Sequence, residues 1–278
     1  MIMEIKSAVI IFFSPTGATR KVVSSFVQGM NIDNIQIVNL NLSGERAKLK
    51  LTIRSDILII GLPVYGKRIP KFLYPFLTNI EGNNKPVVLI TVYGNISPGW
   101  AMEELYVITK RRNLRAIALG KFIGEHSFSV PALPIAKGRP DQADLSEAQM
   151  FGKLTGEKLM AAQGIEDAEL KLAKPLIIGN MITFLHAIFL QKSGNIFTKL
   201  PSINVNLCQM CGICVQSCPR QAIDRNDLRI RRDLCIRCFS CVKNCPSGAR
   251  EIKFKKKIVV TWFLNKQGKF SKKPEYIL

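Results

Sequence analysis

The stretch Ala8-Val9-Ile10-Ile11-Phe12-Phe13-Ser14-Pro15-Thr16-Gly17-Ala18-Thr19 joins an apolar run of strand length to a short loop of hydroxyl residues and glycine. An amphipathic segment at residues 19–30 follows this loop and predicts a helix. Four further apolar runs alternate with amphipathic segments along the first 125 residues. The other predicted strands are residues 35–40, 57–62, 87–92 and 117–123, and the other predicted helices are residues 44–51, 70–80 and 100–113.

This alternation indicates a parallel sheet with helices on both faces, because apolar runs without polar alternation are typical of strands buried on both sides. Ligands of such open sheets bind where the strands reach their carboxyl ends. We therefore predict an α/β fold with a doubly wound, five-stranded parallel sheet in residues 1–170. Binding residues are expected in the loops that follow its strands. After a loop at 131–141, residues 142–172 predict one long helix.

All eight cysteines lie in the last third of the chain, in two copies of the pattern Cys-x-x-Cys-x-x-Cys-x-x-x-Cys-Pro. The copies span residues 208–219 and 235–246. This spacing is typical of [4Fe–4S] ligation, in which the fourth cysteine of each run binds the other cluster. The predicted ligands are Cys208, Cys211, Cys214 and Cys245 for the first cluster, and Cys235, Cys238, Cys241 and Cys218 for the second.

Two alternatives compete for the cysteines. Structural zinc usually takes ligand pairs separated by longer gaps, which fits two tight runs poorly. A disulfide framework is typical of secreted chains, but residues 1–6 lead directly into the first apolar run with no cleavage site behind it. We therefore expect a cytoplasmic protein with thiolate-bound metal. The chain has only two histidines, which excludes a histidine-rich metal site.

The loop after the first strand carries the features of an anion site. Backbone N–H groups at a helix N-terminus bind anions, and a glycine permits a close turn. The loop matches neither Gly-x-Gly-x-x-Gly nor the Walker pattern. Its Ser/Thr-x-Thr-Gly-x-Thr pattern resembles the FMN phosphate loop of flavodoxins, and the alternative is a plain strand–helix turn capped by threonine. The predicted binding residues are Ser14, Thr16, Gly17, Ala18 and Thr19.

Two further loops support a flavin site. Pro63-Val64-Tyr65-Gly66 follows the third predicted strand, and Tyr93-Gly94-Asn95 follows the fourth. Tyr65 and Tyr93 are predicted to flank the flavin ring by stacking. Backbone groups of Gly66, Gly94 and Asn95 are predicted to face its polar edge. For either tyrosine alone, the alternative is an ordinary residue of the core or surface.

The whole chain resembles a family of flavodoxin–ferredoxin fusion proteins from anaerobic bacteria and archaea. Besides the loops and cysteine runs above, the resemblance includes Gly124-Glu125-His126-Ser127-Phe128 and Gly138-Arg139-Pro140-Asp141, and it covers about residues 5–250. It implies a flavodoxin-like FMN domain followed by a small α+β, bacterial-type 2[4Fe–4S] ferredoxin domain. The predicted divisions are 1–170 (FMN domain), 171–200 (helical connector, with a helix at 175–190), 201–255 (ferredoxin domain) and 256–278 (basic and apolar tail).

Two smaller features have competing interpretations. His126 follows the fifth predicted strand, so it is a weak catalytic candidate as a proton donor near the flavin. The alternative is a structural histidine. The segment at residues 138–141 is predicted either to cover the flavin pocket or the cluster domain, or to form a capped loop that enters a helix.

The chain is strongly basic, with 40 Lys and Arg against 20 Asp and Glu. Residues 201–278 hold 16 of the basic and 5 of the acidic side chains. This excess predicts electrostatic docking of acidic redox proteins such as a ferredoxin, a flavodoxin or an oxidoreductase. Nucleic acid is disfavoured because no recognition module is present. Peripheral membrane contact through residues 253–257 and the apolar stretch 258–264 is an alternative.

Together these features predict an electron-transfer flavoprotein, with clusters that carry one electron each and an FMN that takes one or two. The alternative is an FMN-dependent reductase of a small acceptor, such as a quinone or a nitro compound, fed through the clusters. Positive side chains beside the cofactors predict reduction potentials less negative than those of acidic relatives. The side chains concerned are Lys67, Arg68, Arg220, Arg237 and Lys243.

Overall fold

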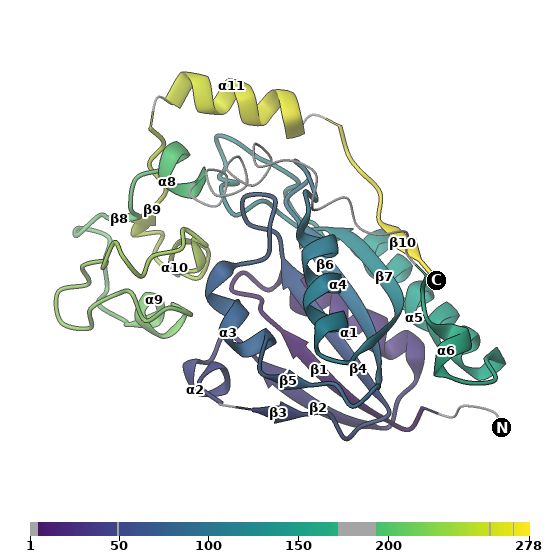
Figure 1. Cartoon of the computed structure of the whole chain (residues 1–278). Coiled ribbons are helices and arrows are strands. Elements are labelled where there is room, and N and C mark those ends of the chain that lie inside the picture. Colours follow the sequence, from purple (N-terminus) through teal and green to yellow (C-terminus); the bar gives the residue numbers. More distant parts are fainter. Residues whose placement is uncertain (1–4, 49, 172–192, 256, 269) are drawn as a thin grey trace, which may run out of the picture.

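The computed structural model describes residues 5–48, 50–171, 193–255, 257–268 and 270–278 (Figure 1). The helix predicted at 175–190, and with it most of the predicted connector, lies outside these residues. None of the helices formed by the described part of the chain is both long enough and apolar enough to cross a membrane.

The predicted five-stranded parallel sheet is confirmed. Its strands are β1 (Ser7–Phe12), β2 (Asn34–Asn39), β4 (Ile57–Pro63), β6 (Pro86–Tyr93) and β7 (Arg115–Ile123). They lie in the order β2-β1-β4-β6-β7 and pair in parallel throughout. This is the flavodoxin-like order, in which the chain switches direction across the sheet between β1 and β4.

Both faces of the sheet are covered, as the unbroken apolar strands require. Every residue of β4 and β6 is buried. One face packs against α1 (Ala18–Met30) and α5 (Gln142–Ala161), which bring Phe26 and Phe151 into contact at 4.9 Å. The other face packs against α3 (Tyr74–Leu77) and α4 (Ala101–Arg111). Figure 1 shows these helices on either side of the strands.

Some predicted helices are shorter than expected. The segment 44–51 yields only α2 (Ser43–Arg46), and 70–80 yields the 3-10 turn Lys71–Leu73 and then α3. The ends of these two segments form a small parallel pair, β3 (Leu51–Thr52) with β5 (Ile80–Glu81). The long helix predicted at 142–172 is broken into α5 and α6 (Ile165–Ala168), because Ala162 and Gly164 adopt extended backbone.

The cysteine-rich part forms a second, small unit beside the carboxyl ends of the sheet strands (Figure 1). Each cysteine run contributes one short helix, α9 (Ile213–Gln216) or α10 (Ser240–Lys243), and β8 (Ser202–Ile203) pairs antiparallel with β9 (Arg250–Glu251). Gly212 precedes α9 in the left-handed region, and Phe239 occupies the equivalent position before α10 with φ 56°. The buried Phe239 ring packs against Phe128 at 5.5 Å, which offsets the backbone strain.

The C-terminal segment returns to the first domain, which the sequence did not predict. After α11 (Lys257–Gly268) the chain runs back along the molecule and adds β10 (Glu275–Ile277) to the sheet, antiparallel to β7 (Figure 1). The flavodoxin-like sheet therefore has a sixth strand, from residues that the sequence assigns to a tail. A strand of three residues, two of them exposed, carries little of the apolar signal that identified the other five.

Replacing Tyr276 in β10 by alanine is expected to lower the thermal midpoint of unfolding by several degrees. Its ring stacks on Phe151 at 4.8 Å with an interplanar angle of 26°. Loss of a half-buried aromatic contact costs about 1–2 kcal/mol. The control is Phe270→Ala, because the Phe270 side chain is 74% exposed. Equal midpoints for the two variants in a calorimetric scan would show that packing of Tyr276 in β10 does not stabilise the sheet.

Candidate functional site

The predicted binding loops meet at the carboxyl ends of the strands. A hollow of about 50 Å³ lies at the start of α1 and is lined by the loops that follow β1, β4, β6 and β7. Its walls include the predicted residues Ser14, Thr16, Ala18, Thr19, Pro63, Val64, Tyr65, Tyr93 and Gly94. The topology explains this convergence, because parallel strands deliver their following loops to one edge of the sheet.

The loop between β1 and α1 presents unused backbone donors. Gly17 caps α1 in the left-handed region with φ 91°, and the buried Ser14 accepts a hydrogen bond from Arg20 N at 3.0 Å. No acceptor in the described part of the chain takes the amide hydrogens of Ala18 and Thr19. A helix N-terminus with free N–H groups fits a phosphate. The exposed Thr16 side chain stands at the mouth of this hollow.

A larger cavity of about 570 Å³ lies next to the hollow. The two share the lining residues Val64, Tyr65, Gly94, His126 and Ser127, so they are adjacent. The large cavity also reaches the cysteine-rich unit and the two elements beside it, α8 (Ser193–Phe197) and α11. Its volume lies within the range of cofactor sites, roughly 300–1,000 Å³. A phosphate at the hollow and a flat ring in the cavity therefore fit the shape of this space.

Three predicted residues have less direct positions. Gly66 lines only the large cavity, and Gly17 shapes the loop without lining either space. Asn95 lines neither space and is 3% exposed. The Asn95 amide instead holds the C-terminal segment: its Nδ2 donates to Phe270 O at 2.9 Å, and its Oδ1 accepts from Lys272 N at 3.1 Å.

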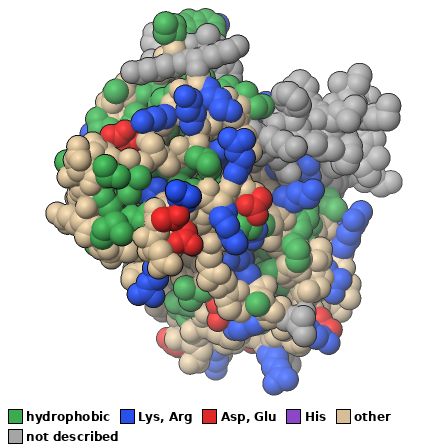
Figure 2. Space-filling model, turned by 90° about the vertical axis from the view of Figure 1, so that its left-hand side faces the viewer, with side chains coloured by type: hydrophobic (Ala, Val, Ile, Leu, Met, Phe, Trp, Pro, Cys, Tyr) green, Lys and Arg blue, Asp and Glu red, His purple; other side chains and the backbone are tan. Residues whose placement is uncertain are grey.

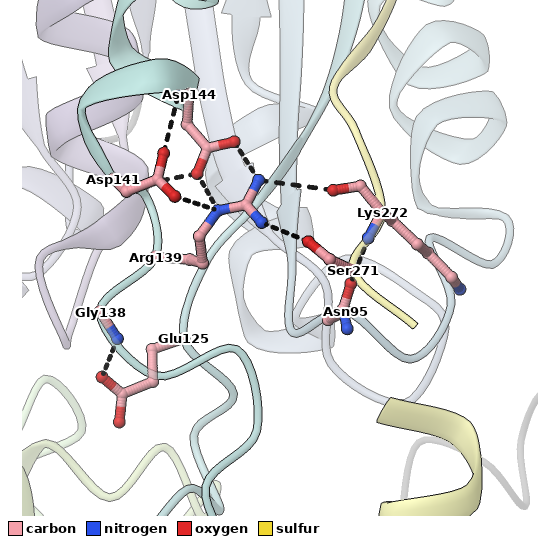
Figure 3. Close-up of polar contacts among 8 residues, drawn as sticks. All are labelled: Asn95, Glu125, Gly138, Arg139, Asp141, Asp144, Ser271 and Lys272. Carbon is pink, nitrogen blue, oxygen red and sulfur yellow. Dashed lines mark hydrogen bonds and ion pairs between the residues drawn. The ribbon is translucent and has the colours of Figure 1, made fainter. Parts of the chain in front are cut away.

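Figure 3 shows that Arg139 fastens the same segment from the other side. Its guanidinium pairs with the buried carboxylate of Asp144 and donates to Ser271 Oγ at 3.0 Å. Asp141 caps α5 and shares a capping box with Asp144. Of the two interpretations of residues 138–141, the capped loop entering a helix is therefore the observed one, with the additional task of holding residues 271–272.

The two tyrosines lie in different surroundings. Tyr65 lines both spaces, and burial together with the Cys238 thiol raises the pKa of its hydroxyl well above the usual value. A predicted flavin residue and a predicted cluster ligand are thus close enough to interact electrostatically. Tyr93 is 4% exposed, and Lys272 Nζ lies 5.8 Å from its ring centroid. The C-terminal segment therefore covers Tyr93.

His126 lines both spaces and is held in one tautomer. Its Nδ1 accepts a hydrogen bond from Phe128 N at 3.0 Å, so the proton of the neutral ring belongs to Nε2. Burial and the Lys243 ammonium lower the pKa of His126 to about 4. At neutral pH the ring is a hydrogen-bond donor through Nε2 and not a reservoir of a labile proton. Gly94 is required beside it, because a Cβ there would lie 2.4 Å from His126 Cδ2.

The low pKa of His126 predicts a pH-dependent stability. An unfolded histidine titrates near pH 6.5, so between about pH 6.5 and about pH 4 the unfolded chain binds the additional proton. This contribution to stability is complete above pH 6.5 and is lost as the pH falls. His126→Asn keeps an acceptor for Phe128 N and removes the titration. Between pH 7 and pH 5, we expect the free energy of unfolding of wild type to fall by about 2 kcal/mol relative to this variant. If the thermal midpoints of wild type and His126→Asn change equally with pH, the prediction is contradicted.

The cysteines are all free thiols in the structure. No group of three or more His, Cys, Asp or Glu side chains among the described residues is arranged around one metal ion. The second predicted ligand set is drawn together: Cys218, Cys235 and Cys241 all act electrostatically on the buried Cys238. Of the first set, Cys214 packs with Cys241 in one small core to which Cys208 also contributes.

Three buried guanidinium nitrogens bear on whether the unit fits an iron–sulfur cluster. They are Arg220 Nε, Arg237 Nη1 and Arg250 Nε, and none has a hydrogen-bond partner among the described residues. Arg220 and Arg237 lie within two residues of a cysteine in the sequence. Arg250 Nη2 lies 3.8 Å from Cys214 Sγ. Buried donors without acceptors are costly, so they favour a group that brings acceptors into this unit. Cluster and thiolate sulfurs are such acceptors.

Two of the five charges expected to tune the cofactors are balanced by ion pairs. Lys243 Nζ lies 2.6 Å from Glu125 Oε1, and Arg68 pairs with Glu104. The sequence predicts a solvated helix face for Glu104, but its side chain is 10% exposed. No ion pair within the described part of the chain involves Lys67, Arg220 or Arg237. The sequence could not separate the paired from the unpaired basic side chains, because both acidic partners come from other elements.

Short contacts join the two units at this site. Ser240 Oγ, at the start of α10, donates to Pro15 O in the β1–α1 loop at 2.6 Å. Lys243 reaches Glu125 and also donates to Ser129 O at 2.7 Å. Arg46 bonds to the carbonyl of Pro219. Direct hydrogen bonds therefore hold the loop at the anion hollow against the second cysteine run.

Comparison with known proteins found one matching family and several similar solved structures. Residues 200–246 match a family described as a 4Fe-4S dicluster domain. Similar solved structures include a flavodoxin from the domain Archaea, with 16% identity and a TM-score of 0.38, over 55% of this chain and 98% of that chain. Fusobacterium nucleatum flavodoxin bound to flavin mononucleotide gives 13% identity and a TM-score of 0.39, over 55% and 98%.

An FMN-dependent NADH-azoreductase from Bacillus anthracis is similar at 11% identity and a TM-score of 0.37, over 55% of this chain and 99% of that chain. A comparison with curated proteins gave no match. The chain thus carries a 4Fe–4S dicluster domain after a flavodoxin-like domain. The assignment of the first domain rests on its strand order.

Proposed function

We propose that this protein transfers electrons between two [4Fe–4S] clusters and one FMN, and between these cofactors and an external redox protein. One observation carries the proposal: the large cavity next to the anion hollow is also lined by Cys235, a predicted cluster ligand. A flavin ring in this cavity and a cluster at the second cysteine set would be neighbours. FMN, when bound, would exchange one or two electrons, whereas each cluster exchanges one.

The residues of the chain supply position and electrostatics for this chemistry. The free amides of Ala18 and Thr19 would hold the FMN phosphate. Tyr65 would line the flavin site, and Cys238 is close enough to it to raise the pKa of its hydroxyl. His126 Nε2–H would donate a hydrogen bond toward the ring at neutral pH, since its pKa is about 4.

An acidic redox protein is the proposed partner, and its docking face would be next to the first cysteine run. Val205 is 74% and Met210 60% exposed there, and Cys211 is exposed between them and α9. The exposed Arg225 and Arg229 lie on the same unit. Figure 2, which faces this side of the molecule, shows apolar and basic side chains interspersed with few acidic ones. An apolar centre with basic neighbours suits a transient, electrostatically steered complex in the cytoplasm.

The test begins with anaerobically purified wild-type protein. Its visible spectrum is recorded, and its iron, sulfide and FMN contents are measured. The expected result is about eight iron atoms and one FMN per chain. Rapid mixing with a reduced acidic ferredoxin should then bleach the cluster absorbance before the flavin absorbance. Reduction that falls steeply as the ionic strength rises supports the docking proposal. Absence of FMN or iron, or flavin reduction that precedes cluster reduction, would overturn the proposed route.

The size and charge of the large cavity favour a second candidate function, reduction of a small anionic acceptor. Four basic residues line the cavity against one acidic residue, Asp233. The basic residues are Lys67, Lys71, Arg220 and Arg237. An aromatic acceptor with a negative group, such as a quinone sulfonate, suits these cations and the apolar wall formed by Phe72 and Ile236.

Lys71→Gln is expected to raise KM about three- to tenfold for 1,4-naphthoquinone-2-sulfonate, with reduced ferredoxin as donor. The KM for neutral 1,4-naphthoquinone should stay unchanged, because only the anion loses a charge partner. Lys71 is exposed at the cavity, so its loss should not perturb folding. Lys153→Gln on α5 is the control, since Lys153 is 63% exposed and lines neither space. Equal changes for both acceptors would argue against an anion-selective cavity.

A further inference from the structure

Arg250 is a buried cation in the cysteine-rich unit. It lies in β9, five residues after Cys245, and is 4% exposed. Its Nη2 donates to Leu228 O at 2.6 Å and lies 3.8 Å from Cys214 Sγ. Its Nε is buried and has no partner among the described residues. The side chain is therefore fixed at one end, with donor capacity left over.

A buried guanidinium requires a counter-ion. Arginine does not lose its proton in proteins, and burial of an unpaired charge is strongly unfavourable. No ion pair in the described part of the chain gives Arg250 a carboxylate partner. The groups beside it that carry negative charge are sulfurs, beginning with Cys214. The counter-ion of Arg250 is thus to be sought among the cysteines and what they bind.

Arg250 faces both predicted ligand sets. Cys214, from the first set, and Cys241, from the second, pack in one small core with Leu228, whose carbonyl binds Arg250. By contrast, Arg237 stands within the second cysteine run. Of the buried arginines, Arg250 is thus the one held against the core in which the two sets meet, through Cys214 Sγ and Leu228 O.

We propose that Arg250 is the shared counter-ion of the two [4Fe–4S] clusters and raises the reduction potentials of both. This inference rests on the ligand sets of the proposed function. Reduction of a cluster adds one negative charge, and a fixed positive charge in a poorly solvated site stabilises that reduced form. A cation shared by both clusters keeps their potentials close, which suits passage of single electrons from one to the other.

The test is a redox titration of full-length Arg250→Met, monitored by the EPR signals of the reduced clusters. At a given ambient potential, the ratio of reduced to oxidised cluster should fall at least tenfold for both clusters, a shift of about 59 mV for one electron. Arg250→Lys keeps the charge and should stay closer to wild type for both. Arg229→Met is the control, because the Arg229 side chain is 88% exposed.

A shift of only one cluster, or of neither, would overturn the shared role. If Arg250→Met does not retain the iron content of wild type, Arg250→Gln takes its place, since glutamine keeps a donor for Leu228 O without the charge. Equal potentials for Arg250→Gln and Arg250→Lys would then refute a charge effect. Failure of the proposed function has a different signature, because wild-type protein itself would then lack two clusters. Full wild-type loading with unmoved variant potentials refutes this inference alone.

Discussion

Cys218→Ala is expected to lose one cluster and keep the other, so that iron falls from about eight to about four atoms per chain. Cys218 belongs to the first cysteine run, yet its charge acts on Cys235, Cys238 and Cys241 of the second run. It is therefore the expected fourth ligand of the cluster nearer the flavin cavity. The measurements are iron and sulfide contents of anaerobically purified protein.

Cys245→Ala is the matched control, since it should remove the other cluster and give the same iron content. With ferredoxin as donor, both variants should reduce their flavin more slowly than wild type, because the proposed route enters beside the first cluster and reaches the flavin from the second. Full iron content in Cys218→Ala, or flavin reduction at the wild-type rate in that variant, would contradict the ligand role of Cys218.

The sequence predicted the sheet well because the signal is local. The central strands β4 and β6 are uninterrupted apolar runs, and burial on both faces is the physical cause of such a run. The edge strand β2 differs from this expectation, because four of its six residues are exposed. The loops that line the site follow these strands directly, so a correct strand assignment also locates Tyr65 and Gly94. Cysteine spacing is equally local and predicts ligands without any knowledge of the fold.

Features that depend on distant segments could not be predicted. Asn95 follows a strand, as a flavin residue would, but its amide is occupied by residues 270–272, about 175 positions later in the chain. The sequence predicted Arg68 and Lys243 as unpaired charges, but in the structure they form ion pairs with Glu104 and Glu125. Arg250 stands outside the repeated cysteine pattern, and only its burial beside Cys214 draws attention to it.

Thr16→Asp is expected to weaken FMN binding about 10- to 100-fold. The Thr16 side chain is exposed and lines the hollow into which Ala18 and Thr19 present their free amides, so the new carboxylate would stand beside the phosphate. Two like charges about 4 Å apart near a protein surface repel by up to roughly 4 kcal/mol, and salt reduces this value. The measurement is the dissociation constant of FMN by fluorescence titration of flavin-depleted, cluster-loaded protein.

Thr16→Asn separates charge from shape, because asparagine has the size of aspartate without its charge. It should bind FMN within a few-fold of wild type. The loss in Thr16→Asp should also shrink at high ionic strength, since an exposed carboxylate is screened there. Iron content should be unchanged in both variants, because Thr16 adjoins the anion hollow and no cysteine run. Equal affinities for the two variants would place the FMN phosphate elsewhere and leave the free amides of α1 without a ligand.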